Sequence, residues 1–130
     1  MKRIAILALM LTIPFILSCG EDHGSSPQAF KYEPPQTPSD FEAAGGTYEV
    51  TLTWSYPQEL IPGIREFRIY YYYDLYDMVE FVDTTTAMSF VDSDLIPNVT
   101  YCYKISAVDT TGLEGYRSGH ECAKTAATLD

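Results

Sequence analysis

The chain has 130 residues, of which 46% are hydrophobic and 20% are charged. This length and composition suffice for one globular domain with a hydrophobic core and exclude two domains of ordinary size. Acidic residues outnumber basic residues by 18 to 8, and the formal net charge is -10. Because such a surface repels a phosphate backbone, we expect no nucleic acid among the partners.

The first 18 residues have the layout of an export signal. Lys2 and Arg3 give a positive start, an apolar run extends from residue 4 to residue 17, and the stretch "ILSC" ends at Cys19. The run is shorter than the roughly 20 apolar residues that a membrane-spanning helix needs. The segment is therefore expected to direct export.

The stretch "ILSC" resembles the lipobox of bacterial lipoproteins, in which a peptidase cuts before a cysteine that carries a diacylglycerol. The resemblance implies that residues 1–18 are a signal peptide and that Cys19 carries acyl chains such as palmitate. These chains would anchor the protein to a membrane of the bacterial cell envelope, outside the cytoplasm, with the outer membrane or cell surface favoured over the inner membrane. A plain secretory peptide and an uncleaved anchor are the alternatives.

Residues 19–34 are expected to form a flexible stalk, because "GEDHGSSPQAFKYEPP" contains turn formers, charges and prolines without apolar periodicity. Loss of Lys2 and Arg3 with the signal leaves 6 basic and 18 acidic residues, so that the formal charge changes from -10 to -12. We expect residues 35–130 to form an acidic domain that is held close to the membrane surface.

Apolar and polar side chains alternate from residue 47 onward. In "TYEVTLTWS", Tyr48, Val50, Leu52 and Trp54 alternate with polar residues, which predicts a strand with one buried face. Further runs of this kind, separated by turn-forming residues, cover residues 67–73, 78–82, 88–91 and 100–108. Several short strands with regular turn signals and no helical period indicate an all-β sandwich or barrel.

Four segments resemble the fibronectin type III domain. "PPQTPSDFEAAGG" is similar to its first strand, "VTLTWSYP" to its second, "IREFRIYY" to its third, and "SFVDSDLIPNVTYCYKISAVDTTGLEGYRS" to its fifth and sixth strands and the following loop. The resemblance implies a seven-stranded, immunoglobulin-like β-sandwich. An immunoglobulin domain is the nearest rival, but it has its tryptophan on the third strand, whereas Trp54 lies on the second.

The resemblance also implies a tyrosine corner, in which the phenol of Tyr101 bonds to nearby backbone and Asn98 takes a positive φ. Leu95 and Pro97 fit the spacing of this motif. The residues that we expect in the structural core are Trp54, Phe67, Ile69, Tyr71, Leu95 and Tyr101.

Two cysteines remain once Cys19 is assigned to lipid. On the sixth strand of the implied fold, alternation turns Cys102 outward, and a hairpin folded about Gly112 brings it opposite Cys122. We therefore expect a disulfide in this exported protein, with two free thiols as the alternative. The same alternation turns Glu121 inward, which predicts a bulge or an open end of the sandwich at this residue.

The stretch "RIYYYYDLYD" contains four consecutive tyrosines on the third strand of the implied fold. Alternation predicts that Tyr71 and Tyr73 face the core and that Tyr70 and Tyr72 lie exposed on the outer face of the sheet. Tyr70 and Tyr72 are thus the candidate binding face, where a phenol ring stacks on a sugar or a protein partner. The alternative is that these tyrosines merely favour strand formation.

Catalytic and metal-binding constellations are not predicted. His120 is the one histidine of residues 35–130, and we expect it to be solvated on an edge strand. Two clusters of acidic residues could either bind calcium or lie solvated in turns. Solvated turns are preferred, because the spacing of these acidic residues lacks the density of ligands in a calcium-binding loop. The acids are Asp74, Asp77 and Glu80, and Asp92 and Asp94.

These observations predict a non-catalytic interaction module without cofactor or metal, tethered to a membrane. The expected partner is an envelope protein or a glycan. The alternatives are an inert structural spacer or assembly subunit and an accessory carbohydrate-binding factor for envelope enzymes. A catalytic enzyme ranks below both, because residues 35–130 contain one histidine and no recognisable catalytic motif. The family resemblance itself implies architecture and says little about activity.

Overall fold

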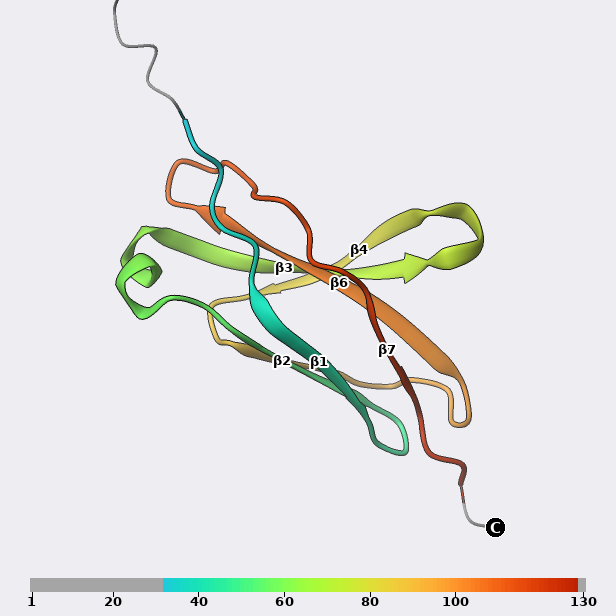
Figure 1. Cartoon of the computed structure of the whole chain (residues 1–130). Helices are drawn as coiled ribbons and strands as arrows, with labels where there is room; N and C mark the ends of the chain where they lie inside the picture. Colours follow the sequence, from blue (N-terminus) through green and yellow to red (C-terminus); the bar gives the residue numbers. More distant parts are fainter. Residues whose placement is uncertain (1–31, 129–130) are drawn as a thin grey trace, which may run out of the picture. The chain divides into compact units, whose positions relative to one another are not determined.

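The computed structural model describes residues 32–128, which form two antiparallel sheets (Figure 1). One sheet has the strand order β1-β2-β5, and the other has the order β4-β3-β6-β7. The elements are β1 (Ser39–Gly45), β2 (Val50–Ser55), η1 (Gln58–Gly63), β3 (Ile64–Tyr73), η2 (Asp74–Tyr76), β4 (Met78–Thr85), β5 (Ser89–Asp92), β6 (Thr100–Asp109) and β7 (Glu121–Lys124). The predicted all-β class is confirmed, and seven strands in two packed sheets are the arrangement of a β-sandwich.

The hydrophobic core lies between the two sheets. Trp54 of β2 packs edge to face against Phe67 of β3, with ring centroids 5.5 Å apart. Of the six predicted core residues, Trp54, Phe67, Ile69 and Leu95 are buried, while Tyr71 and Tyr101 are partly buried against the same cluster. The other buried members are Val50, Leu52, Tyr56, Tyr103, Ile105, Ala107 and Ala123.

The predicted alternation holds along β2 but not before it. Val50, Leu52 and Trp54 are buried, whereas Tyr48 is 55% exposed. The amide of Gly46 donates to the carbonyl of Glu49 at 2.7 Å, so residues 46–49 form a tight turn and the strand begins at Val50. The expectation that Tyr48 faces the core is therefore wrong.

The tyrosine corner is present. The amide of Ile96 donates to the phenol oxygen of Tyr101 at 3.1 Å, and Asn98 has a φ of 59°, as predicted. The buried hydroxyl of Thr125 accepts from the amide of Val99 at 3.0 Å and donates to the carbonyl of Ile96 at 2.7 Å. The corner is thus tied to the segment that follows β7.

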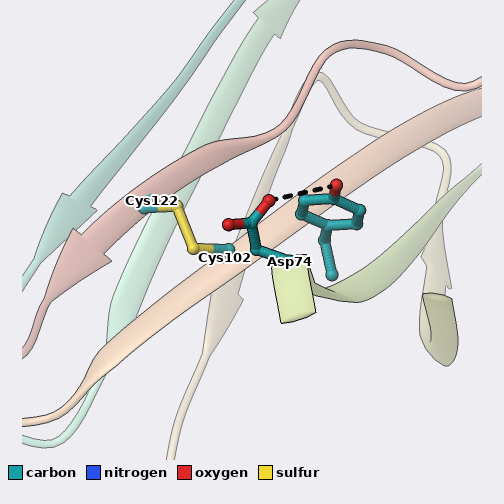
Figure 2. Close-up of a disulfide and its surroundings, with 4 residues drawn as sticks. Asp74, Cys102 and Cys122 are labelled. Atoms are coloured by element: carbon teal, nitrogen blue, oxygen red, sulfur yellow. Dashed lines mark hydrogen bonds between the residues drawn. A yellow bond between two sulfur atoms is a disulfide. The ribbon is translucent and has the colours of Figure 1, made fainter. Parts of the chain in front are cut away.

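A disulfide joins β6 to β7, as Figure 2 shows. Cys102 lies opposite Cys122 in a ladder that runs from Thr100 to Tyr103 without a register shift. Glu121 is the first residue of β7 and is exposed. The ladder therefore has no bulge at Glu121, and of the two predicted arrangements the open end of the sandwich fits, because the strand begins at this exposed residue.

No helix within residues 32–128 is long and apolar enough to cross a membrane.

Candidate binding cleft between β3 and β6

The strands β3 and β6 separate at one end of their sheet. Their ladder ends at the pair Tyr71 and Tyr103, although β3 continues to Tyr73 and β6 begins at Thr100. Beyond this pair β3 stays with β4, and β6 stays with β7. In Figure 1 the end of β3 and the start of β6 accordingly lie apart, with the end of β3 above the start of β6.

A cleft of about 460 Å³ lies at this separation. It is lined by residues 71–73 of β3, by residues 100–102 of β6, and by residues 94–96 and Val99 of the loop between β5 and β6. The volume falls within the range of sites that hold small molecules or parts of a larger ligand. Tyrosines and aliphatic side chains together make up most of the wall, as is typical of such sites.

The predicted alternation of the four tyrosines between the core and the outer face of the sheet fails at Tyr73. Tyr71 packs against the core, as expected, but Tyr73 is 43% exposed. Tyr73 lies beyond the last pair of β3 and β6, so no neighbouring strand covers it on that side. Its phenol donates to the Glu80 carboxylate at 2.8 Å, and this hydrogen bond is the main cause that raises the pKa of Tyr73.

Tyr70 is only 6% exposed, and the prediction that it lies open on the outer face is wrong. The loop after β6 folds back over its ring. The phenol donates to the Glu114 carboxylate, the guanidinium of Arg117 lies 4.4 Å from the ring centroid, and Phe81 of β4 packs edge-on at 6.0 Å. The candidate binding face of Tyr70 and Tyr72 is therefore reduced to Tyr72.

Glu114 holds this loop against the sheet. Its carboxylate also accepts from the hydroxyl of Ser106 at 2.7 Å and from the guanidinium of Arg68 at 3.1 Å. Burial raises the pKa of Glu114, but the hydrogen bonds from Ser106 and Tyr70 and the charges of the two nearby arginines outweigh burial, so its pKa lies below the ordinary value. Sequence reasoning missed Glu114 because its partners on β3, Arg68 and Tyr70, lie 46 and 44 residues away in the chain.

Tyr72 is partly covered on the outer face. The ring of His120 stacks on it with centroids 4.6 Å apart, and Nζ of Lys104 lies 4.4 Å from the same centroid. The phenol donates to Asp77 at 3.2 Å and to Asp74 at 3.5 Å, and Figure 2 shows Asp74 in the surroundings of the disulfide. His120 is exposed, as expected, but it packs on Tyr72.

The acidic side chains differ in their surroundings. Asp74, Asp77, Glu80 and Asp94 are exposed, in agreement with the solvated-turn interpretation. Asp92, by contrast, is only 8% exposed, so the same interpretation is wrong for this residue. No group of three or more potential metal ligands occurs within the part of the chain that the structure describes.

Asp92 joins the two sheets. Its Oδ2 atom accepts from the phenols of Tyr71 and Tyr103, both at 2.7 Å. Burial, and then the hydrogen bond to Asp92, raise the pKa of both phenols well above the ordinary value. The contact fixes the Tyr71 wall of the cleft, and the local sequence gives no signal of it because the partners lie 21 and 11 residues away.

Lys2, Arg3, Cys19 and most of the expected stalk lie outside residues 32–128, and their predicted roles remain predictions.

The sequence matches no protein-family model and no curated protein. Solved structures with similar folds include FN3tt, which is 21% identical with a TM-score of 0.58 over 70% of this chain and 94% of that chain. A Fn3-like protein from Clostridium thermocellum is 19% identical with a TM-score of 0.60 over 75% of this chain and 100% of that chain. The family 28 exopolygalacturonase of Yersinia enterocolitica is 14% identical with a TM-score of 0.60 over 72% of this chain and 21% of that chain. The described domain therefore has a fold like that of fibronectin type III domains, as the sequence segments predicted.

Proposed function

We propose that this protein is a non-catalytic binding module of the bacterial cell envelope, held at a membrane by lipid on Cys19, and that the cleft between β3 and β6 is its binding site. The observation that carries the binding role is the aromatic cleft beside exposed apolar side chains. The anchoring role is supported by the resemblance of "ILSC" to a lipobox.

Exposed apolar side chains gather at this end of the domain. Tyr73 and Ile96 line the cleft and are 43% and 65% exposed. Leu75, Tyr76 and Met78 follow Tyr73 directly at the turn between β3 and β4 and are also exposed. Several large exposed apolar side chains in one region favour an interaction there, because leaving them in water is unfavourable.

Contacts within the domain itself hold the walls of the cleft in place. Asp92 fixes the phenol of Tyr71, and the tyrosine corner fixes Tyr101 beside Ile96. The disulfide ties Cys102 to β7. A site whose side chains are already ordered loses less conformational entropy on binding, which favours affinity for a small contact area.

Variants of the cleft test this proposal in intact cells. We expect Tyr73→Ser combined with Ile96→Ser to reduce crosslinking of partners to the membrane-associated protein. The matched control is Tyr116→Ser combined with Val91→Ser, which replaces an exposed tyrosine and an exposed β-branched residue away from the cleft. Equal crosslinking by both double variants, at equal protein levels, would show that the cleft is not the binding site.

A further inference from the structure

All four consecutive tyrosines of β3 donate a phenol hydrogen bond to a carboxylate, and for Tyr71 the acceptor is the buried Asp92. Tyr70 donates to Glu114, and Tyr72 donates to Asp77 at 3.2 Å. Tyr73 donates to Glu80 at 2.8 Å. Each ring thus has a carboxylate oxygen at its hydroxyl end in addition to the negative electrostatic potential of its face.

Two of these rings are contacted by a cation of the protein itself. The guanidinium of Arg117 lies 4.4 Å from the ring centroid of Tyr70, and Nζ of Lys104 lies 4.4 Å from that of Tyr72. Cations within about 6 Å of an aromatic centroid are attracted by the ring. The tyrosine and carboxylate pair therefore attracts a basic side chain at two successive outward-facing positions of one strand.

Tyr73 forms the same kind of pair with Glu80, and of the two residues Tyr73 lines the cleft. Its ring is 43% exposed and lines the cleft, and Glu80 is exposed beside it. Asp94 lines the cleft as well. Within residues 32–128 neither Glu80 nor Asp94 forms an ion pair, and the ion pairs of the domain gather instead around Glu66 and Glu114. The cleft thus combines an exposed aromatic wall with negative charge.

We infer that the cleft binds a lysine or arginine side chain of a partner protein, with the cation over the ring of Tyr73 and with Glu80 and Asp94 supplying the opposite charge. This inference rests on the proposed function, because it takes the cleft as the binding site and adds the charge of the ligand. The segment that carries the cation is extended, since the edge of β3 beyond Tyr71 has no strand partner from β6.

A neutral sugar is the competing occupant, because tyrosine rings also stack on sugars. The two occupants differ in their need for the carboxylates. A cationic side chain depends on Glu80 and Asp94 and weakens when salt screens them, whereas a neutral sugar ring depends on the tyrosine face and responds little to salt.

The test uses the full chain purified in detergent and three probes. The first is a capped peptide of alternating arginine and threonine, the second is the same peptide with neutral citrulline in place of arginine, and the third is cellohexaose. Calorimetric titration is expected to show binding of the arginine peptide, at least tenfold weaker binding of the citrulline peptide, and weaker binding of the arginine peptide at high salt.

Variants then locate the site. Tyr73→Leu and Glu80→Gln are each expected to lower the affinity for the arginine peptide about two- to fivefold. The controls Tyr116→Leu and Glu59→Gln change the same residue types at exposed positions that neither line the cleft nor contact Tyr73, and they are expected to leave the affinity unchanged. Because Glu59→Gln removes the same charge, nonspecific attraction to an acidic protein would affect both glutamate variants equally. Near-ultraviolet circular dichroism verifies that each variant is folded.

Equal binding of the two peptides, no binding of the arginine peptide, preference for cellohexaose, or equal effects of Glu80→Gln and Glu59→Gln would each overturn the inference. The proposed function fails separately, if the cleft double variant retains its crosslinked partners in cells. Loss of those partners together with indifference to peptide charge would leave the cleft as a binding site and reject only the cationic ligand.

Discussion

Replacing Asp92 by alanine is expected to destabilise the domain by about 3–5 kcal/mol. The carboxylate is 8% exposed and accepts two phenol hydrogen bonds of 2.7 Å, from Tyr71 and Tyr103. A hydrogen bond to a charged group contributes about 1.5–3 kcal/mol, and the alanine variant leaves both phenols without this acceptor. Relief from burying the Asp92 charge offsets part of the loss, which keeps the expected value below the full sum.

Urea unfolding followed by tryptophan fluorescence measures this effect as a fall in the midpoint at an unchanged slope. Asp92→Asn keeps an oxygen acceptor and is expected to lose about 1–2 kcal/mol. Ser93→Ala, an exposed neighbour without a positive φ, is expected to stay within about 0.5 kcal/mol of the parent. A loss below about 1 kcal/mol for Asp92→Ala would refute the reasoning that this carboxylate is a principal link between the sheets.

Three further predictions concern pH, redox state and the anchor. Burial and the hydrogen bond to Asp92 raise the pKa of Tyr71 and Tyr103 in the folded domain. The contribution of these phenols to stability is therefore complete below about pH 10 and is lost as the pH rises beyond it, so the urea midpoint is expected to fall above about pH 10. A midpoint that does not change with pH in this range would contradict the burial of these phenols. Reduction of the bridge between Cys102 and Cys122 is expected to lower the unfolding free energy by about 3 kcal/mol, and non-reducing peptide mapping that finds two alkylatable thiols would count against the bridge. Cys19→Ala is expected to abolish acylation and release the protein from the membrane fraction. Unmodified Cys19 in the mature native protein, measured by intact-mass analysis, would contradict the lipoprotein hypothesis.

The strands and much of the core followed from the sequence because both depend on local pattern. Alternation in "TYEVTLTWS" located β2 and the buried Trp54, and the motif around Tyr101 predicted the corner and the positive φ of Asn98. The bridge between Cys102 and Cys122 was predictable because two paired strands and a central turn make positions equidistant from Gly112 meet.

The cleft and its surroundings were not predictable, because they depend on contacts between distant segments. Alternation placed Tyr70 correctly on the outer face, but it carries no information about the loop that brings Glu114 and Arg117 over the ring. The exposure of Tyr73 follows from the point at which β3 and β6 separate, and strand patterns do not specify that point. The buried Asp92 likewise depends on two phenols from other strands.

The central claim is that the cleft between β3 and β6 contacts a partner in the cell envelope. The most direct measurement places a photocrosslinking amino acid at Ile96, which lines the cleft and is 65% exposed, and separately at Val91, which is 49% exposed on β5 of the other sheet. Irradiation of intact cells is predicted to give discrete protein adducts from position 96 and none from position 91. No adduct from position 96, or the same adducts from both positions, would contradict the assignment of the cleft as the binding site.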